Sequence, residues 1–389
     1  MTRPLRIAVI AGEESGDLLG ADLVRALRAR SGRDIELIGV GGQHLAELGL
    51  QSIFDPSEIA LMGITAVLRD LPKLALRIGQ TARAVAAAKP DCLITIDSPA
   101  FNLRVSRKVR ALDPAIPIVK YVCPSVWAWR PSRAPWMKPF IDHVLCLLPF
   151  EPAELERLGG PPGTYVGHRL THEPGLREAT RAQAEYRLAA DGSRTLLLLP
   201  GSRRSEVRGL LADFGATVAL LAARGMRLRL LLPTVPNVEA LVEEGVAAWP
   251  LRPEILRGPD AKWRAFAEAD AAMIASGTVS LELALAGVPM ISCYRNDRIV
   301  RTIRHWITVW SAALPNIIAD RPIVPEFYDD MVRPPLLARQ MEALLQPGHP
   351  RDAQIEGFAE VRRRMATDRP PGEIAADAVL GLLDEKGRL

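Results

Sequence analysis

The residues best suited to chemistry lie in short polar turns, and one such turn is near the middle of the chain. The apolar run 196–199 is followed by Gly201, Ser202 and Arg203, and Glu206 lies in the helical pattern that comes next. Gly201 would let the backbone approach an anion, which the helix N–H groups and the Arg203 guanidinium would bind. The turn therefore predicts a phosphate site that includes Ser202 and Glu206, with an ordinary strand-to-helix turn as the alternative.

A second turn of the same kind follows the apolar run that ends at residue 275. Ser276 is expected to cap the next helix, and the N–H groups there would hold a diphosphate together with Gly277 and Thr278. Glu282 would lie one to two helical turns further on, within reach of a ribose diol. Two such turns in one half of the chain predict a nucleoside diphosphate site, with a capped helix and a surface glutamate as the alternative.

Three carboxylates follow predicted strands in the first half of the chain. Glu13, Asp17 and Asp97 occupy positions where a general base would take a proton from an acceptor hydroxyl. Each of them also suits a helix cap or a turn, and Asp97-Ser98-Pro99 fits an Asx-type turn. The sequence leaves the choice among these roles open.

Two tryptophans in three residues stand out in a chain with seven. Trp127 and Trp129 lie beside Arg130, and such a group can stack on a sugar or lie against a lipid interface. A plug of the core under a loop is an equal alternative.

Two segments fit a lipid surface. Residues 59–68 are uncharged and precede a basic helix, and Arg298, Arg301 and Arg304 alternate with apolar residues. The alternative, which we favour on this pattern alone, is an apolar helix beneath a basic face, as is common in soluble proteins.

The elements that would position these turns alternate between short apolar runs and helical patterns. This alternation predicts an α/β fold with parallel, doubly wound sheets in two Rossmann-like halves that face a central cleft. Ligands bind such sheets at the carboxyl ends of the strands, so the turns are expected to converge there. The expected strands are 6–11, 35–40, 92–96, 116–122, 144–148, 195–199, 228–232, 271–275 and 289–293.

Length and composition fit this architecture. The 389 residues suit two domains, and the net charge of +4 fits anionic ligands or an anionic membrane surface without favouring nucleic acid. Cys92, Cys123, Cys146 and Cys293 are widely spaced, which predicts reduced core thiols in a cytosolic protein and no metal site. We expect no membrane-spanning helix, because charges and prolines interrupt every long apolar stretch.

Taken together, the motifs resemble the lipid-A-disaccharide synthase family of GT-B glycosyltransferases. The resemblance covers nearly the whole chain, in the family's order, and as a set the motifs are highly specific. The matching pieces are AGEESGDLLGA (11–21), LMGI (61–64), IDSPAFN (96–102), YVCPSVWAWR (121–130), PFE (149–151), VGH (166–168), LLPGSRRSEV (198–207), ASGTVSLE (275–282) and LPN (314–316).

The resemblance implies inverting transfer of 2,3-diacylglucosamine from its UDP carrier to the 6-hydroxyl of 2,3-diacylglucosamine 1-phosphate. It also implies no cofactor, no catalytic metal and peripheral attachment to the inner face of the inner membrane; a homodimer is a further expectation. The expected domains are 1–170 for the acceptor, 171–345 for the UDP-sugar, and C-terminal helices 346–389 that pack back on the first domain. Substrate contacts are expected from Ser15, Gly16, Met62, Asn102, Ser125, Trp127, Arg130 and Asn316.

Two positions depart from the family pattern, which usually has Asp at Ala100 and Pro at Arg169. The first departure removes one candidate carboxylate, so we expect Asp97 to be the base, with Glu13 and Asp17 as alternates. Arg203 is expected to stabilise the leaving UDP. The alternatives are another GT-B enzyme, such as a peptidoglycan-type glycosyltransferase, a UDP-sugar epimerase, or a module that binds a nucleotide without turnover.

Overall fold

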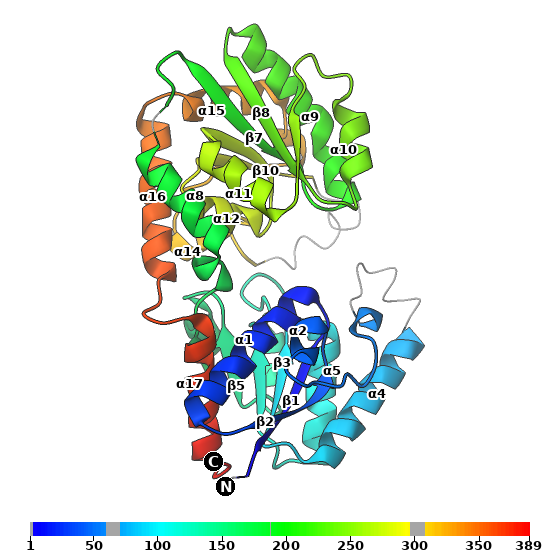
Figure 1. The fold of residues 1–389 in the computed structure, drawn as a ribbon. Helices are drawn as coiled ribbons and strands as arrows, with labels where there is room; N and C mark the ends of the chain where they lie inside the picture. The colour runs from blue at the N-terminus through cyan, green and yellow to red at the C-terminus, as the bar shows by residue number, and fades with distance from the viewer. Residues whose placement is uncertain (1–2, 60–70, 187, 296–307) are drawn as a thin grey trace. The chain divides into compact units, whose positions relative to one another are not determined.

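The computed structural model describes residues 3–59, 71–186, 188–295 and 308–389, and the chain forms two compact units (Figure 1). The first unit comprises residues 1–169 and 367–389, and the second comprises 170–366. The first unit was expected to end at residue 170, one residue after the boundary that the structure shows. Assigning all of 346–389 to the first domain is wrong, because helix α16 (His349–Met365) lies in the second unit and only α17 (Pro371–Glu385) lies in the first.

The first unit is built on a six-stranded parallel sheet with the order β2-β1-β3-β4-β5-β6. The strand order reverses between β1 and β3, which is where sheets of this type bind ligands. Its elements are β1 (Leu5–Ala11), α1 (Glu14–Ser31), β2 (Ile35–Val40), α2 (Gln43–Ala46), η1 (Pro56–Glu58), α4 (Leu71–Ala88), β3 (Cys92–Ile96), α5 (Pro99–Leu112), β4 (Ile118–Tyr121), α6 (Arg133–Met137), β5 (His143–Cys146), α7 (Glu151–Arg157), β6 (Gly163–Tyr165) and α17.

Alternate residues of β1 enter two cores, one on each face of this sheet. Ala8 and Ile10 pack with the apolar residues of α4 and α5, whereas Ile7 and Val9 pack with those of α1 and α17. Figure 1 shows α17 beside α1. A strand buried on both faces reads as a continuous apolar run, which is why the sequence predicted it.

The second unit repeats this plan with the strand order β12-β11-β10-β7-β8-β9, and all its pairings are parallel. Here the order reverses between β7 and β10. Its elements are η2 (Arg169–His172), α8 (Pro174–Glu185), β7 (Ser193–Leu199), α9 (Arg204–Ala223), β8 (Arg227–Thr234), α10 (Glu239–Val246), β9 (Glu254–Arg257), α11 (Pro259–Glu268), β10 (Ala271–Ala275), α12 (Val279–Ala286), β11 (Met290–Tyr294), α14 (Leu314–Ala319), β12 (Glu326–Tyr328), η4 (Asp329–Met331), α15 (Pro334–Leu345) and α16.

The predicted α/β class with two doubly wound parallel sheets is confirmed. Three strands of the structure, β6, β9 and β12, had not been predicted, and all three lie at sheet edges. Within the described ranges, none of the helices combines the length and the apolar character that a membrane span requires. The four cysteines are free and buried.

Candidate functional site

Two carboxylates come together where the strand order of the first sheet reverses. Glu13 follows β1, and Asp97 follows β3, which pairs with β1. Burial, and then the negative charge of Asp97, raise the pKa of Glu13. Of the three predicted carboxylates, these two therefore form a pair that could accept and hold a proton.

The backbone at Asp97 is held in an unusual conformation. Asp97 and Ser98 have φ values of 49° and 39°, in the left-handed region that costs non-glycine residues free energy. The Asp97 carbonyl accepts hydrogen bonds from Lys120 Nζ at 2.7 Å and from Asn102 Nδ2 at 2.9 Å. These two side chains fix the turn that carries the Asp97 carboxylate.

Lys120 is a site residue that sequence reasoning missed. It is completely buried on β4, and its Nζ also donates to the carbonyls of Tyr121 and Thr95, at 2.9 and 3.3 Å. Burial lowers the pKa of Lys120 to about 8, against the opposing charges of Asp97 and Cys123. The available signal was a lysine within the apolar run 116–122.

Asn102 and Asp17 were predicted to act on substrate, and the structure gives both another role. Asn102 is fully buried, and its amide donates to the carbonyls of Ile96 and Asp97. Asp17 is 3% exposed and accepts from the N–H groups of Gly42, His44 and Leu45 at 2.6, 2.7 and 3.4 Å. Asn102 therefore braces the Asp97 turn, and Asp17 caps α2.

Two residues at the start of α1, Ser15 and Gly16, were predicted to contact substrate, and they differ in exposure. Ser15 is exposed, so it stays a candidate contact. Gly16 is buried, and a Cβ built there would lie 3.5 Å from Ile96 Cγ2, so it faces the sheet rather than a ligand.

The two tryptophans of the loop after β4 lie in different environments. Trp127 packs edge-to-face against Phe150 and donates from Nε1 to the buried carboxylate of Glu151 at 3.2 Å, as expected for a core plug. Trp129 is 36% exposed, and the guanidinium carbon of Arg130 lies 4.4 Å from its ring centre. Ser125 is also exposed. The surface part of this motif is thus Ser125, Trp129 and Arg130.

A buried cluster near this loop brings together Cys123, Cys146 and Glu151, with their sulfur and oxygen atoms within 4.8 Å of one another. The spacing of these residues in the sequence gave no sign of it. The Glu151 carboxylate accepts from Trp127 and from the N–H groups of Leu147 and Leu148, both at 3.0 Å. These three bonds engage both carboxylate oxygens, and burial raises the pKa of Glu151 to about 7.

In the second unit, the turn after β7 holds an anion from its own chain. Glu206 Oε2 accepts from the N–H groups of Ser202 and Arg203 at 3.0 and 3.2 Å, and its Oε1 accepts from Arg203 Nη1 at 2.7 Å. Gly201 has φ 116°, and a Cβ there would lie 2.4 Å from Glu206 Oε2. The N–H groups and the guanidinium predicted to bind a phosphate are thus present in this turn, but in this structure they bind the Glu206 carboxylate.

The turn after β10 is more open. Gly277 has free space around it, and among the residues placed by the structure the N–H groups of Gly277 and Thr278 meet no acceptor. The prediction that Ser276 caps α12 is wrong: Thr278 is the N-cap residue, and the Ser276 hydroxyl donates to the carbonyl of Ala312 at 3.4 Å. This turn and the Gly201 turn lie at the β7/β10 reversal of the second sheet.

Glu282 and Asn316, predicted to contact substrate, have partners within the second unit. Lys262 Nζ lies 3.1 and 3.0 Å from the two oxygens of Glu282, which orients this carboxylate. Asn316 is 1% exposed; its Oδ1 accepts from the N–H groups of Ile323 and Val324, and its Nδ2 donates to Glu326. Asn316 is therefore a buried brace rather than a surface contact.

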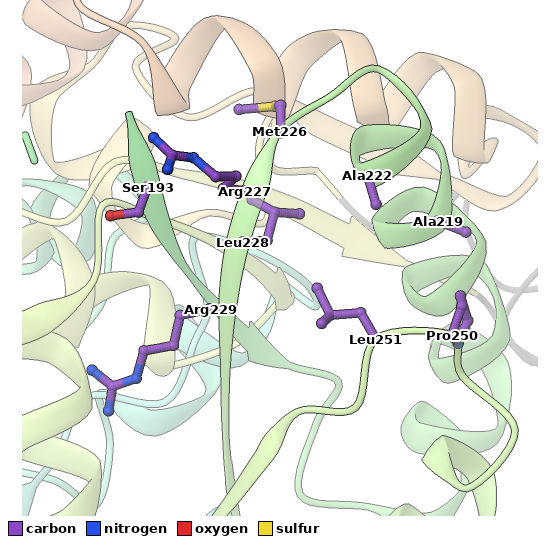
Figure 2. Close-up of a pocket in the computed structure, with 9 residues that line it drawn as sticks. All are labelled: Ser193, Ala219, Ala222, Met226, Arg227, Leu228, Arg229, Pro250 and Leu251. Atoms are coloured by element: carbon purple, nitrogen blue, oxygen red, sulfur yellow. The ribbon is translucent and has the colours of Figure 1, made fainter. Parts of the chain in front are cut away.

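A pocket of about 610 Å³ lies at the other end of the second sheet, where β7 and β8 begin. Figure 2 shows Leu228 and Leu251 between β8 and the helix that carries Ala219 and Ala222. None of the predicted site residues lines it. Met62, Arg298, Arg301 and Arg304, on which part of the lipid prediction depends, lie outside the residues that the structure describes.

Comparison with known proteins identifies relatives over nearly the full chain. The family model of lipid-A-disaccharide synthetase matches residues 7–368. A lipid-A-disaccharide synthase of Bradyrhizobium diazoefficiens is 46% identical over 390 residues, which cover 98% of this chain and 97% of the relative. One from Rhodospirillum centenum is 43% identical over 387 residues, covering 99% and 96%.

Solved structures share the fold at low identity. A glycosyltransferase of kitacinnamycin has a TM-score of 0.63 at 17% identity, covering 98% of this chain and 100% of that one. An S. aureus MnaA–UDP co-structure has a TM-score of 0.62 at 12% identity, covering 99% and 98%. MurG of Acinetobacter baumannii has 0.56 at 13%, covering 98% and 100%.

Proposed function

We propose how the residues of this chain, which belongs to the lipid-A-disaccharide synthase family, carry out that family's reaction. The chain is a glycosyltransferase of lipid A and lipopolysaccharide biosynthesis. It transfers 2,3-diacylglucosamine from UDP-2,3-diacylglucosamine to the 6-hydroxyl of 2,3-diacylglucosamine 1-phosphate. The products are the β-1,6 disaccharide 1-phosphate and UDP.

The Glu13 and Asp97 pair carries the assignment of the acceptor to the first unit. Asp97 takes the proton of the 6-hydroxyl as that oxygen bonds to the anomeric carbon of the donor. The bond from this carbon to the UDP oxygen breaks in the same displacement, so the configuration inverts. Glu13, whose pKa is raised, orients the acceptor beside the base. Ser15 and Ser125 are exposed contacts for the same substrate.

The second unit binds the donor at its β7/β10 edge. The open N–H groups of Gly277 and Thr278 support a diphosphate there, with Glu282 directed to the ribose. Arg203 is 73% exposed, and it neutralises the leaving UDP once the phosphate displaces Glu206. The S. aureus MnaA structure, which shares this fold, is a co-structure with UDP, and this likeness supports the proposal that the chain binds a uridine nucleotide. Positive groups of the chain stabilise the leaving group, so the mechanism uses no catalytic metal or other cofactor.

We also propose peripheral attachment to the anionic inner face of the inner membrane. Leu76 on α4 is 63% exposed on a helix that also carries the exposed basic residues Lys73 and Arg83. Lys73 is paired with Glu58, which reduces its share in lipid binding. We further propose that the chain forms a homodimer, and sedimentation with and without detergent would measure its oligomeric state.

Other enzymes with this fold are less well supported. The UDP-N-acetylglucosamine 2-epimerases and MurG are only 11% to 15% identical to this chain, so their similarity indicates a shared fold and not a shared function. The relatives at 46% identity favour the disaccharide synthase over both alternatives.

The decisive experiment supplies purified protein with UDP-2,3-diacylglucosamine and the monosaccharide 1-phosphate acceptor, in EDTA. We expect UDP release and disaccharide formation in equal amounts, and both should require the acceptor. UDP release without acceptor would instead indicate hydrolysis or epimerase-type chemistry, and UDP binding without turnover would indicate a binding module. Activity that needs an added divalent ion would contradict the metal-free mechanism.

A further inference from the structure

Two arginines lie over the exposed Trp129 of the first unit, and the charge of a third acts on one of them. The guanidinium carbons of Arg130 and Arg133 lie 4.4 and 5.5 Å from the Trp129 ring centre. Burial lowers the pKa of Arg133, and the positive charges of Arg130 and of Arg104 on α5 lower it further. We call Trp129 and these three arginines the Trp129 cluster.

This cluster has no counter-charge among the residues that the structure places. Other arginines of the same unit, such as Arg6 and Arg77, form ion pairs with glutamates. Arg104 donates instead to the carbonyl of Ala100, and no ion pair is formed by the Trp129 cluster within the described ranges. Like charges held together at a partly buried site repel one another, and a bound anion would relieve this repulsion.

The backbone adds an independent observation. Arg130 has φ 53°, a left-handed conformation that disfavours any residue with a side chain, and its carbonyl accepts from Arg133 N at 2.9 Å. Such strain persists where the surrounding structure maintains it, and it gathers at binding sites. The strained backbone at Arg130 belongs to the turn whose two arginines, Arg130 and Arg133, lie against the same indole ring.

The cluster lies near the catalytic edge of the first sheet. Its loop follows β4, which pairs with β3, and Arg104 belongs to the helix that begins two residues after Asp97. The sugar acceptor carries its 6-hydroxyl at one end and its phosphate at the other. A phosphate bound at the cluster therefore suits a hydroxyl presented to Asp97.

We propose that the Trp129 cluster binds the phosphate monoester of the acceptor lipid and thereby selects the phosphorylated monosaccharide. The inference rests on the proposed function. A phosphate monoester carries a charge of about −1.5 to −2 at neutral pH. Arginine forks bind its oxygens in bidentate geometry, which makes a cluster of arginines more suitable than a single one.

The test compares diacylglucosamine 1-phosphate with unphosphorylated diacylglucosamine, both in neutral detergent micelles. Their dissociation constants are measured for the wild type, Arg130→Gln and Arg133→Gln. Each variant should weaken binding of the phosphorylated lipid by roughly tenfold or more and leave the unphosphorylated lipid within about twofold. The control is Arg107→Gln, because Arg107 lies on the same helix as Arg104 and rests on another ring, Trp136.

Each other outcome has a distinct meaning. Equal weakening of both lipids, or of neither, overturns the phosphate assignment, and so does an equal effect of Arg107→Gln. Vesicles of phosphatidylcholine with and without phosphatidylglycerol form a further arm. Variants that lose only vesicle binding would show that the cluster binds bulk lipid phosphate, which also overturns it. If the wild type forms no disaccharide, the proposed function fails instead.

Discussion

The Nζ atom of Lys120 donates a 2.7 Å hydrogen bond to the backbone oxygen of Asp97, so a fully buried ammonium group holds the turn that presents the proposed base. Asn102 donates to the same oxygen at 2.9 Å. The turn keeps its left-handed backbone through these two contacts, and the position of the Asp97 carboxylate depends on them.

Replacing Lys120 should therefore act on turnover more than on donor binding. Lys120→Met should lower kcat roughly ten- to a hundredfold, because misplacing a catalytic group by about 1 Å has effects of that size. The KM for the UDP-sugar should change little. In the wild type, kcat should also fall as the pH rises through about 8, where Lys120 loses its proton. Steady-state kinetics test this against Lys108→Met, an exposed control on α5, and a wild-type kcat for Lys120→Met would contradict it.

Asp97→Asn should reduce kcat by roughly two to four orders of magnitude, because the amide cannot take the acceptor proton. Glu13→Gln should have a smaller effect, which appears mainly in the KM for the acceptor. Rate–pH profiles of both variants measure the difference. A full rate for Asp97→Asn across the pH range would exclude Asp97 as the base.

Arg203→Ala should lower kcat by roughly two to three orders of magnitude through the loss of leaving-group stabilisation. The side chain is exposed, so thermal unfolding should change little. Arg204→Ala removes the adjacent exposed arginine and is the matched control. Equal kinetics for the two variants would remove Arg203 from the site.

Asp17→Asn should weaken the fold and leave the chemistry intact. One oxygen that accepts backbone N–H bonds becomes a donor, which should cost about 1–3 kcal/mol in the free energy of unfolding. At a temperature where the variant is folded, kcat should stay within about threefold of the wild type. Urea unfolding with Asp22→Asn as a surface control measures the first effect, and a large loss of kcat would restore Asp17 as a catalytic candidate.

Glu151 should make stability depend on pH. Burial raises its pKa from 4.5 to about 7 on folding, so the stability it contributes is complete below pH 4.5 and is lost as the pH rises through 7. Glu151→Gln does not titrate. The wild type should therefore lose about 3 kcal/mol relative to this variant between pH 4.5 and 7, as urea unfolding at several pH values would show. A pH-independent difference would contradict the raised pKa.

The strands at the sheet centres could be predicted from the sequence because both faces are buried, which makes them continuous apolar runs such as 196–199. The edge strands β6, β9 and β12 lack that signal, because their residues are only partly buried or exposed apart from Phe327. The turns around Glu13, Asp97, Gly201 and Gly277 could also be predicted, since each follows a strand, and parallel strands bring their carboxyl ends to one edge.

Residue type and spacing were also enough to indicate the family. They could not separate a polar residue that faces a ligand from one that braces the chain. Asp17 caps a helix that begins 26 residues later, and Asn316 and Lys120 bond to backbone groups of neighbouring segments. Only the packed fold decides which donors and acceptors such side chains meet, because burial brings together groups that are distant in sequence. The same fold joins α17 to the first unit and brings Arg130 and Arg133 to one indole ring.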